Sequence, residues 1–336
     1  MKVQIIGLGN VGANLLDLMN REKEHIISLG YNVRIISISD SNGTIINDNC
    51  LTLNEVMEYK KNGWRKCKQY IKDYDALESI KNIESDVVVE LTPSTSNGEP
   101  GLSHIREALK CGKNVVTANK GPLVVAYDEL VTLAKKNNVQ LLYEATVAAH
   151  LPIFCLLRSC FTMDRVIKMK GILNSTTNYI IGEIESGKIF KEALDVAIKA
   201  GWAETNYSDD IDGVDAARKL VILANSIFGC GSKLEGVSVT GIRNVEKIIR
   251  DARNRGMKVK LLCELERGPR NVMMRVSPQM IALDDPLATV NKGDMGVKLT
   301  FRNSGEVFVS VKYNSPFQTA QAVLNDIINI NQRLCA

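Results

Sequence analysis

Residues 3–12 of the chain, VQIIGLGNVG, join a short apolar stretch to a glycine-rich turn. Val3–Ile6 has the composition of a buried strand, and Ala13–Met19 continues with the apolar periodicity of a helix. The GxGxxG pattern between them lets the chain turn, lets the backbone approach a pyrophosphate and lets the helix pack closely on the strand. The N-terminus of that helix also favours negative charge. The segment therefore predicts a dinucleotide-binding site.

The next predicted strand, Val33–Ser39, ends at Asp40. A carboxylate in this place reads the ribose 2′-hydroxyl of NAD, so Asp40 favours NAD over NADP. The acidic residue usually follows the glycines by about 20 residues. Here the interval is longer because a charged segment of helical character, Arg21–Tyr31, intervenes. The alternative is that Asp40 only builds a turn, since DSNG at 40–43 is itself favourable turn sequence.

Strands and helices alternate up to Glu144, which predicts a Rossmann-type, doubly wound parallel sheet. Asp86–Leu91, DVVVEL, is a continuous apolar run of the kind that parallel sheets bury on both faces. The loop 92–95 and the loop after the strand Asn114–Thr117 follow carboxyl ends of strands, where ligands bind in such sheets. The second loop holds Lys120, which we expect to face the coenzyme; the alternative is a solvated charge.

After Glu144 the pattern changes to helices followed by strand-like runs, among them Val259–Leu265, Val272–Val276 and Val307–Tyr313. This order predicts an α+β substrate and dimerisation domain with a mainly antiparallel sheet. The predicted domains are residues 1–145 for dinucleotide binding, 146–315 for substrate binding and dimerisation, and 316–336 as a closing helix that can return to the first domain.

An acidic run occupies residues 201–219, GWAETNYSDDIDGVDAARK. From Val214 onward the apolar residues recur at a helical period, with Asp212 or Gly213 as the expected helix start. Asp215 and Lys219 are then four residues apart and project from one face, beside the apolar stripe. One reading is a solvated surface ion pair. The other is a site for a small zwitterion, in which carboxylates hold an ammonium group and Lys219 handles a proton or a negative oxygen.

Composition sets broad limits on function. The 336 residues suffice for two domains, and the 45% hydrophobic and 24% charged content is ordinary for a soluble globular protein. The net charge of +4 comes without Lys/Arg blocks, and no apolar run has membrane-spanning length, so neither nucleic acid nor membrane is an expected partner. The eight cysteines form no CxxC pair, and we expect no signal segment before the first strand. We interpret the cysteines as buried thiols of a cytoplasmic protein.

Several stretches, in order along nearly the whole chain, resemble homoserine dehydrogenase in its short form without a regulatory extension. The most specific are ANKGPL at 118–123, LNSTTNYI at 173–180 and the run GWAET…DDIDGVDAARKL at 201–220. The others are GLGNVG at 7–12, SISDSNG at 37–43, VVVELTPST at 87–95, YEATV at 143–147, DPLATVN at 285–291 and TAQAVLNDI at 319–327.

The resemblance implies interconversion of L-homoserine, a small amino-acid substrate, and L-aspartate-4-semialdehyde, with NAD or NADP as coenzyme and a homodimer as the assembly. By motif, the pyrophosphate would be held by Gly7, Gly9, Asn10, Val11 and Gly12, and the adenosine ribose would face Asp40. The nicotinamide end would be lined by Thr92, Pro93, Asn119 and Lys120.

The same resemblance implies roles in the second domain. The substrate would be bound by Glu204 and Asp210, with Thr176 nearby, and proton transfer would use Lys120 or Lys219, with Asp215 beside them. An amine can serve as general acid or base when desolvation or a second cation brings its pKa nearer to neutral. The family also carries a site for a monovalent cation such as sodium, which would use the Glu144 carboxylate and backbone oxygens near Val147, Ala149 and Leu151.

Two stretches depart from the family pattern. Where the family has a glycine-rich turn, this chain has Ala148, Ala149 and His150 before Leu151-Pro152, and we interpret His150 as a partly packed loop residue. A late glycine loop is replaced by residues 312–317, KYNSPF, in which backbone approach to a coenzyme is harder. The alternatives are a dehydrogenase for another amino-acid-derived alcohol and a catalytically silent nucleotide-binding regulator. The paired lysines argue against the regulator.

Overall fold

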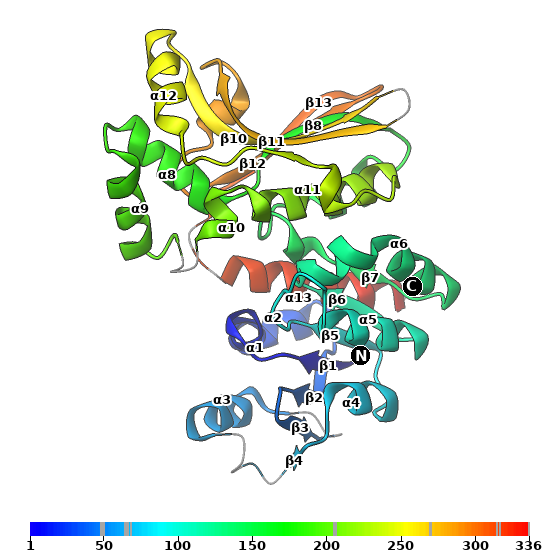
Figure 1. The fold of residues 1–336 in the computed structure, drawn as a ribbon. Helices are drawn as coiled ribbons and strands as arrows, with labels where there is room; N and C mark the ends of the chain where they lie inside the picture. Colours follow the sequence, from blue (N-terminus) through cyan, green and yellow to red (C-terminus); the bar gives the residue numbers. More distant parts are fainter. Residues whose placement is uncertain are drawn as a thin grey trace. The chain divides into compact units, whose positions relative to one another are not determined.

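The computed structural model describes residues 1–47, 51–63, 67, 69–203, 207–268, 271–313, 315 and 317–334. The chain divides into two compact units, which are drawn in Figure 1. The first comprises Met1–Thr146 together with Ser315–Ala336, and the second comprises Val147–Asn314.

The first unit is built on a seven-stranded sheet in the order β4-β3-β2-β1-β5-β6-β7. Its strands are β1 (Lys2–Ile6), β2 (Arg34–Ser39), β3 (Gly43–Ile46), β4 (Tyr70–Lys72), β5 (Val87–Glu90), β6 (Asn114–Thr117) and β7 (Leu141–Leu142). The run from β2 to β7 is parallel, whereas β3 and β4 add an antiparallel edge. Every residue of β5 is buried, as the apolar run predicts.

Helices connect these strands, and one comes from the far end of the sequence (Figure 1). They are α1 (Asn10–Arg21), α2 (Lys23–Ser28), α3 (Leu53–Asn62), α4 (Ala76–Asn82), α5 (Gly101–Lys110), α6 (Lys120–Lys136) and α13 (Phe317–Leu334). Helix α13 packs against α1, and its apolar residues Val323, Ile327 and Ile330 share one core with Leu15 and Leu16. The core of the first unit is therefore assembled from both ends of the chain.

The second unit holds a six-stranded sheet in the order β13-β12-β8-β10-β11-β9, in which only the β9–β11 pair is parallel. Its strands are β8 (Val166–Ile172), β9 (Ser238–Val239), β10 (Lys258–Arg267), β11 (Val272–Ile281), β12 (Met295–Phe301) and β13 (Gly305–Val311). Its helices are α7 (Ile153–Cys160), α8 (Ser175–Glu185), α9 (Phe190–Lys199), α10 (Ser208–Ile211), α11 (Val214–Phe228) and α12 (Val245–Asn254). Helices α11 and α12 both pack on β10 and β11. The predicted fold class, a Rossmann-type sheet plus a mainly antiparallel α+β part, is confirmed.

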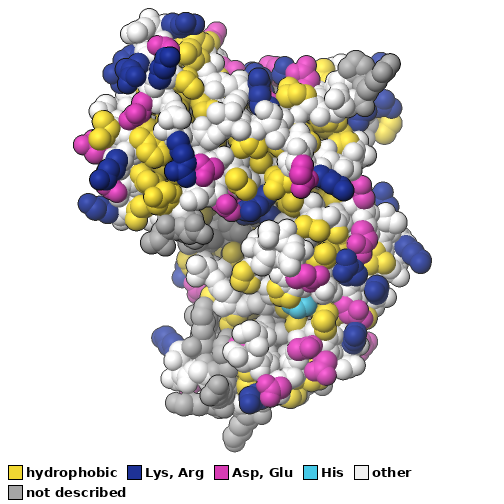
Figure 2. Space-filling model, viewed as in Figure 1, with side chains coloured by type: hydrophobic (Ala, Val, Ile, Leu, Met, Phe, Trp, Pro, Cys, Tyr) yellow, Lys and Arg dark blue, Asp and Glu magenta, His cyan; other side chains and the backbone are white. Residues whose placement is uncertain are grey.

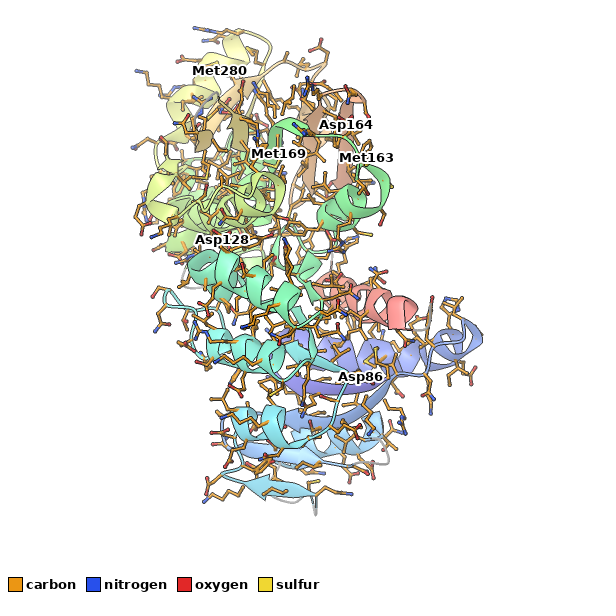
Figure 3. The ribbon with its side chains drawn as sticks, turned by 90° about the vertical axis from the view of Figure 1, so that its right-hand side faces the viewer. Asp86, Asp128, Met163, Asp164, Met169 and Met280 are labelled. Atoms are coloured by element: carbon orange, nitrogen blue, oxygen red, sulfur yellow. The ribbon has the colours of Figure 1, made fainter. Side chains whose placement is uncertain are left out.

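An aspartate fixes the hairpin of β12 and β13 to the start of β8. The carboxylate of Asp164, labelled in Figure 3, accepts hydrogen bonds from the backbone amides of Asn303 and Ser304 and from the Ser304 hydroxyl. The Ser304 hydroxyl is the main cause that lowers the pKa of Asp164, because each donor stabilises the charged form. The contact lies beside the pair of Phe301 and Val166, where the register of β12 against β8 shifts.

Two sequence expectations fail. The sequence pattern predicts no strand at β3 or β4, because each strand is only four or three residues long and turn residues adjoin it. The cysteines were expected to be buried, yet Cys111, Cys160 and Cys230 are exposed, whereas Cys67 and Cys263 are buried. Cys50 and Cys335 lie outside the described residues.

The alanines that replace the family's glycine turn adopt left-handed backbone conformations, with φ of 54° at Ala148 and 53° at Ala149. An L-residue with a Cβ atom pays roughly 1–2 kcal/mol for this conformation, whereas glycine adopts it freely. Ala148 is buried, but Ala149 is partly exposed, so its methyl group contributes less to packing.

We therefore expect Ala149→Gly to raise the free energy of unfolding by about 1 kcal/mol in urea denaturation, because it relieves this strain. Ala13→Gly is the control. Ala13 lies in the ordinary helix α1, where glycine should lower stability by about 1 kcal/mol. Equal destabilisation by both variants would show that the turn is not strained.

Candidate active site

The glycine-rich turn between β1 and α1 has the geometry of an anion cradle. Gly7 has φ of 93°, and a Cβ atom there would lie 2.8 Å from the carbonyl carbon of Leu91. A Cβ atom on Gly12 would lie 2.6 Å from the oxygen of Gly7, whereas the space around Gly9 is open to at least 4 Å. No side chain caps the start of α1, so the amides of its first turn face that open space without a competing acceptor. These residues fit a dinucleotide pyrophosphate.

Asp40 builds the turn that follows β2. Its Oδ1 atom accepts hydrogen bonds from the amides of Asn42, at 2.8 Å, and Gly43, at 3.1 Å. The turn reading of DSNG is thus correct. It does not exclude the ribose reading, because both bonds go to one carboxylate oxygen.

The loops after β5 and β6 are joined through Asn119. Its side-chain oxygen caps α6 by accepting from the Gly121 amide at 3.1 Å, and its amide nitrogen lies 3.3 Å from the Thr92 hydroxyl and 3.5 Å from the oxygen of Pro93. Lys120 is the first residue of α6 and is half-buried. The four residues expected at the nicotinamide end, Thr92, Pro93, Asn119 and Lys120, therefore form one connected cluster at the carboxyl edge of the sheet.

The carboxylates of the acidic run form an exposed group and a buried group. Asp209 forms an ion pair with Arg218, and Asp212 forms one with Arg243. The side chains of Asp209, Asp212 and Arg243 are exposed to solvent. Helix α11 begins at Val214, and Gly213, one of the two residues expected at its start, is the N-cap residue with φ of 80°. Within α11, Asp215 and Lys219 form an ion pair of 2.7 Å whose side chains are only 14% and 12% exposed. This exposure excludes the reading as a solvated surface pair.

A residue that the sequence analysis did not single out joins these groups. The side-chain amide nitrogen of Asn174 donates to Asp210 Oδ1 at 2.6 Å and to Asp215 Oδ2 at 3.0 Å. The Asn174 side-chain oxygen caps α8 by accepting from the Thr177 amide at 2.9 Å. Lys219 Nζ also donates to the backbone oxygen of Leu173 at 2.7 Å. The only sequence signal for Asn174 was its place in LNSTTNYI.

The other predicted substrate residues have different outcomes. The hydroxyl of Thr176 donates to the backbone oxygen of Trp202 at 2.6 Å, and the Trp202 ring stacks on Tyr179. These contacts fasten the beginning of the acidic run to α8. Glu204 lies outside the described residues.

The residues expected to bind a cation belong to both units. Glu144 is buried in the first unit, and its backbone amide donates to Asp326 of α13 at 2.9 Å. Val147 and Leu151 are buried and Ala149 is half-buried in the second unit. Nearby, burial lowers the pKa of His150, which is partly exposed and fits the reading as a loop residue. Among the described residues no group of three or more His, Cys, Asp and Glu side chains is arranged for a metal ion.

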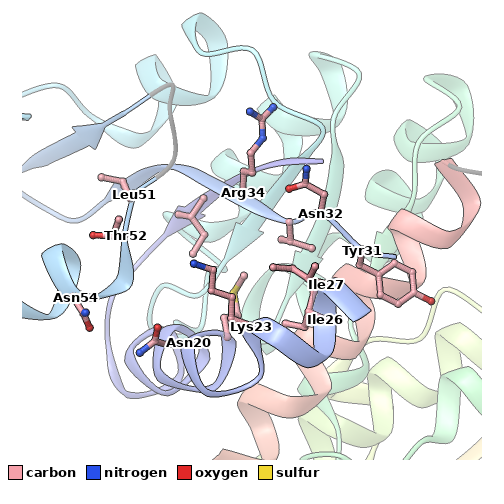
Figure 4. A pocket seen from close by; sticks show the side chains of 13 residues that line it. Asn20, Lys23, Ile26, Ile27, Tyr31, Asn32, Arg34, Leu51, Thr52 and Asn54 are labelled. Carbon is pink, nitrogen blue, oxygen red and sulfur yellow. The ribbon is translucent and has the colours of Figure 1, made fainter. Parts of the chain in front are cut away.

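A cavity of about 470 Å³ lies elsewhere in the first unit, between α1, α2 and the start of β2 (Figure 4). Met19, Ile26 and Ile35 form part of its apolar wall, and Lys23 lies at its rim. Arg34, which also lines it, begins β2, whereas Asp40 follows the opposite end of that strand. The cavity is thus separate from the predicted coenzyme edge. On the face shown in Figure 2, basic and acidic side chains are interspersed, with no extended field of one sign.

A Rossmann sheet with an open glycine cradle, together with a buried lysine–carboxylate cluster, defines a nicotinamide-dependent dehydrogenase. The profile "Homoserine dehydrogenase, NAD binding domain" matches residues 7–144, and the profile "Homoserine dehydrogenase" matches residues 152–328. The chain belongs to the homoserine dehydrogenase family. It is an oxidoreductase that uses NAD or NADP.

Relatives of similar length agree along the whole chain. A homoserine dehydrogenase of Methanocaldococcus jannaschii is 36% identical, and the alignment covers 98% of both chains. An NAD(+)-dependent homoserine dehydrogenase of Pseudomonas canavaninivorans is 31% identical over 98% of this chain and 96% of the relative. The crystal structure of the Thermoplasma acidophilum homoserine dehydrogenase superposes with a TM-score of 0.84 at 30% identity, covering 99% of each chain. A hyperthermophilic archaeal homoserine dehydrogenase in complex with NADPH also gives 0.84 at 30% identity, covering 99% of this chain and 98% of that one. None of the helices in the described part of this chain has the length and hydropathy needed to cross a bilayer.

A buried lysine supports the helix that carries Asn174 and Thr176. Lys260 of β10 is 1% exposed, and its ammonium group donates to the Asn178 side chain at 3.0 Å and to the Val290 oxygen. Asn178 in turn donates to the oxygens of Val290 and Asp294. Burial lowers the pKa of Lys260 from 10.5 to about 8, because the charged form loses its hydration.

This pKa gives a stability prediction. Between pH 8 and 10.5 the unfolded chain holds the Lys260 proton more tightly than the folded chain, so the contribution of Lys260 to stability rises with pH. At about 1.4 kcal/mol per pKa unit, the rise is about 3 kcal/mol. Urea unfolding of the protein and of Lys260→Met at pH 8 and pH 10.5 measures it. The stability difference should shift by this amount in favour of the lysine at higher pH, and an unchanged difference would contradict the assignment.

Proposed function

We propose that the chain interconverts L-homoserine and L-aspartate-4-semialdehyde with the cluster of Asn174, Asp210, Asp215 and Lys219 as its substrate site. The observation that supports this most is the buried 2.7 Å pair of Lys219 and Asp215, which Asn174 connects to Asp210. A site for this small zwitterion requires carboxylates that bind its ammonium group and a cation beside its reacting oxygen. This cluster provides both within one network, and Glu204 is the second carboxylate we propose for the ammonium group.

The hydrogen-bond count of Lys219 supports a role at the reacting oxygen. An ammonium group has three donors. Two of them go to Asp215 and to the oxygen of Leu173, which leaves one for the substrate oxygen. Because the first two contacts fix the direction of the third, Lys219 is oriented before the substrate binds.

When bound, the nicotinamide coenzyme accepts the hydride from the alcohol carbon or donates it to the aldehyde carbon. During oxidation the alcohol oxygen must also lose its proton, and during reduction the carbonyl oxygen must gain one. We propose that Lys219 and Lys120 serve this transfer, with Asp215 stabilising the protonated form of Lys219. Asp210 holds the substrate ammonium group and so fixes the position of the reacting carbon relative to Lys219.

The proposal also assigns the pyrophosphate site, a cation site and the assembly. Gly7, Gly9, Asn10, Val11 and Gly12 would bind the pyrophosphate, supported by the open space at Gly9. A monovalent cation would be held by Glu144 and by backbone oxygens of Val147, Ala149 and Leu151, supported by the burial of Glu144. We also propose a cytoplasmic homodimer in which the second unit carries the interface. A dehydrogenase for a related amino alcohol remains the second candidate, because alanines replace the glycine turn at 148–149.

The reaction is tested by following NADH absorbance with homoserine and NAD. Lys219→Ala should lower kcat by about 100-fold or more, because the oriented amine that exchanges a proton with the substrate oxygen and the charge beside that oxygen are both lost, while NADH affinity stays within about twofold. Arg218→Ala is the matched control, since it removes the neighbouring cation on the same helix and should leave kcat nearly unchanged. Coenzyme binding without oxidation of homoserine or any related amino alcohol would overturn the proposal.

The role of Asp40 in coenzyme choice is separable from its role in the turn. Asp40→Asn keeps a side-chain oxygen for the amides of Asn42 and Gly43 but removes the charge that would repel a 2′-phosphate. We expect the ratio of kcat/KM for NADP to that for NAD to rise by about tenfold. Asp128→Asn, the same change on the exposed face of α6, should not alter the ratio. A ratio that is unchanged in Asp40→Asn would limit Asp40 to its turn.

A further inference from the structure

Glu90, the last residue of β5, is fully buried at the carboxyl edge of the Rossmann sheet. One oxygen of its side chain accepts from the backbone amide of Thr92 at 3.0 Å and from the Thr92 hydroxyl. The other accepts from the hydroxyl of Thr117 at 3.2 Å. A buried carboxyl group is costly unless such donors satisfy it. All three donors belong to the strand ends and loops on which the nicotinamide-end cluster is built.

The network continues from these two threonines into the start of α6. The Thr92 hydroxyl accepts from the side-chain amide of Asn119, and the Thr117 hydroxyl accepts from the Asn119 backbone amide at 3.0 Å. Asn119 caps α6, whose first residue is Lys120. Glu90 is therefore two hydrogen bonds away from the residue that places Lys120.

Helix α5 closes the network tightly. A Cβ atom on Gly101 would lie 2.5 Å from the Asn119 side-chain nitrogen and 3.0 Å from the second Glu90 oxygen. The Nδ1 atom of His104 is 3.8 Å from the first Glu90 oxygen, beyond hydrogen-bond distance. The donors that bond to the Glu90 carboxyl group are neutral and lie at adjacent strand ends and loops. These bonds therefore fix the position of one loop relative to the other.

We propose that Glu90 is a positioning residue, whose buried side chain fixes the loops of Thr92 and Asn119 in the one arrangement that orients the nicotinamide ring and the Lys120 amine. The inference rests on the proposed function, which assigns these loops to the nicotinamide end. Glu90 touches neither substrate nor coenzyme and acts through Thr92 and Asn119.

The first test needs no catalysis. NADH is titrated into the protein, and its fluorescence enhancement reports the surroundings of the nicotinamide ring. Glu90→Met keeps the side-chain volume but removes both acceptors, so we expect most of the enhancement to be lost. The dissociation constant should change by less than about threefold, because Glu90 makes none of its hydrogen bonds to the glycine turn that binds the pyrophosphate, and the Gly7 amide is held by the Ser39 oxygen.

Two further variants make this result specific. Glu90→Gln should retain the enhancement, because its oxygen can accept from Thr92 while its amide donates to Thr117, whose hydroxyl can turn to the Glu90 backbone oxygen at 3.0 Å. Gln4→Met is the matched control. Gln4 is equally buried, in the neighbouring strand β1, and bonds to Ser37 and Ser79, so its loss tests general destabilisation of the sheet.

The second test uses homoserine carrying deuterium at the carbon that bears the hydroxyl group. In Glu90→Met, kcat should fall by about tenfold or more with little change in KM, because misplacement of about 1 Å slows the chemical step. The kinetic isotope effect should rise, because hydride transfer then limits turnover. Gly101→Ala should reproduce this behaviour, because its Cβ atom would displace the Asn119 side chain and press on the Glu90 carboxyl group.

The outcomes separate the two proposals. If the wild-type protein fails to oxidise homoserine but Glu90→Met still loses the NADH enhancement, the positioning role stands and the substrate assignment fails. If Glu90→Met keeps both the enhancement and kcat, or if Gln4→Met loses them to the same extent, Glu90 has only a structural role and the inference is wrong.

Discussion

The proposed substrate site depends on an ion pair between a lysine and a carboxylate that are largely excluded from water. Lys219 and Asp215 lose most of their hydration at this depth, and their mutual attraction alone does not repay that loss. The amide of Asn174 and the backbone oxygen of Leu173 supply the remaining hydrogen bonds. Because both lie at the start of α8, the ion pair fixes the first turn of α8 against α11. Removing one member would leave a buried charge unpaired, at a cost of about 3–5 kcal/mol.

In the first unit, backbone groups take the place of charged side chains. The glycine turn places the uncapped N-terminus of α1 beside open space, so amides provide the positive field that side chains provide in the second unit. The loops after β5 and β6 then need a separate means of alignment, since each belongs to a different strand. Asn119 bonds to the loop after β5, and the buried Glu90 side chain bonds to Thr92 and Thr117, so hydrogen bonds align both loops.

Features that a single helix, strand or turn encodes could be predicted from the local sequence pattern. GxGxxG between a strand and a helix, the buried run of β5 and the spacing of Asp215 and Lys219 in α11 could all be predicted. Asn174 could not be assigned its double role, because its two acceptors lie 36 and 41 residues further along and meet it only through packing of α8 against α10, which itself packs against α11. Strands β3 and β4 were missed for the same reason, since pairing and not composition stabilises such short segments. For Asp40, the turn could be predicted from the sequence. Because the turn is compatible with a ribose contact as well, it does not decide whether Asp40 also binds the ribose.

The shared core of α13 and α1 has a consequence for biosynthesis. The ribosome completes Val147–Asn314 before it adds the helix that covers Leu15 and Leu16. During that interval of translation the nascent first unit exposes an apolar strip that a chaperone can bind. A gene fragment ending near Thr146 would leave the same strip permanently uncovered, so expression of the nucleotide-binding unit alone requires α13 to be appended through a linker.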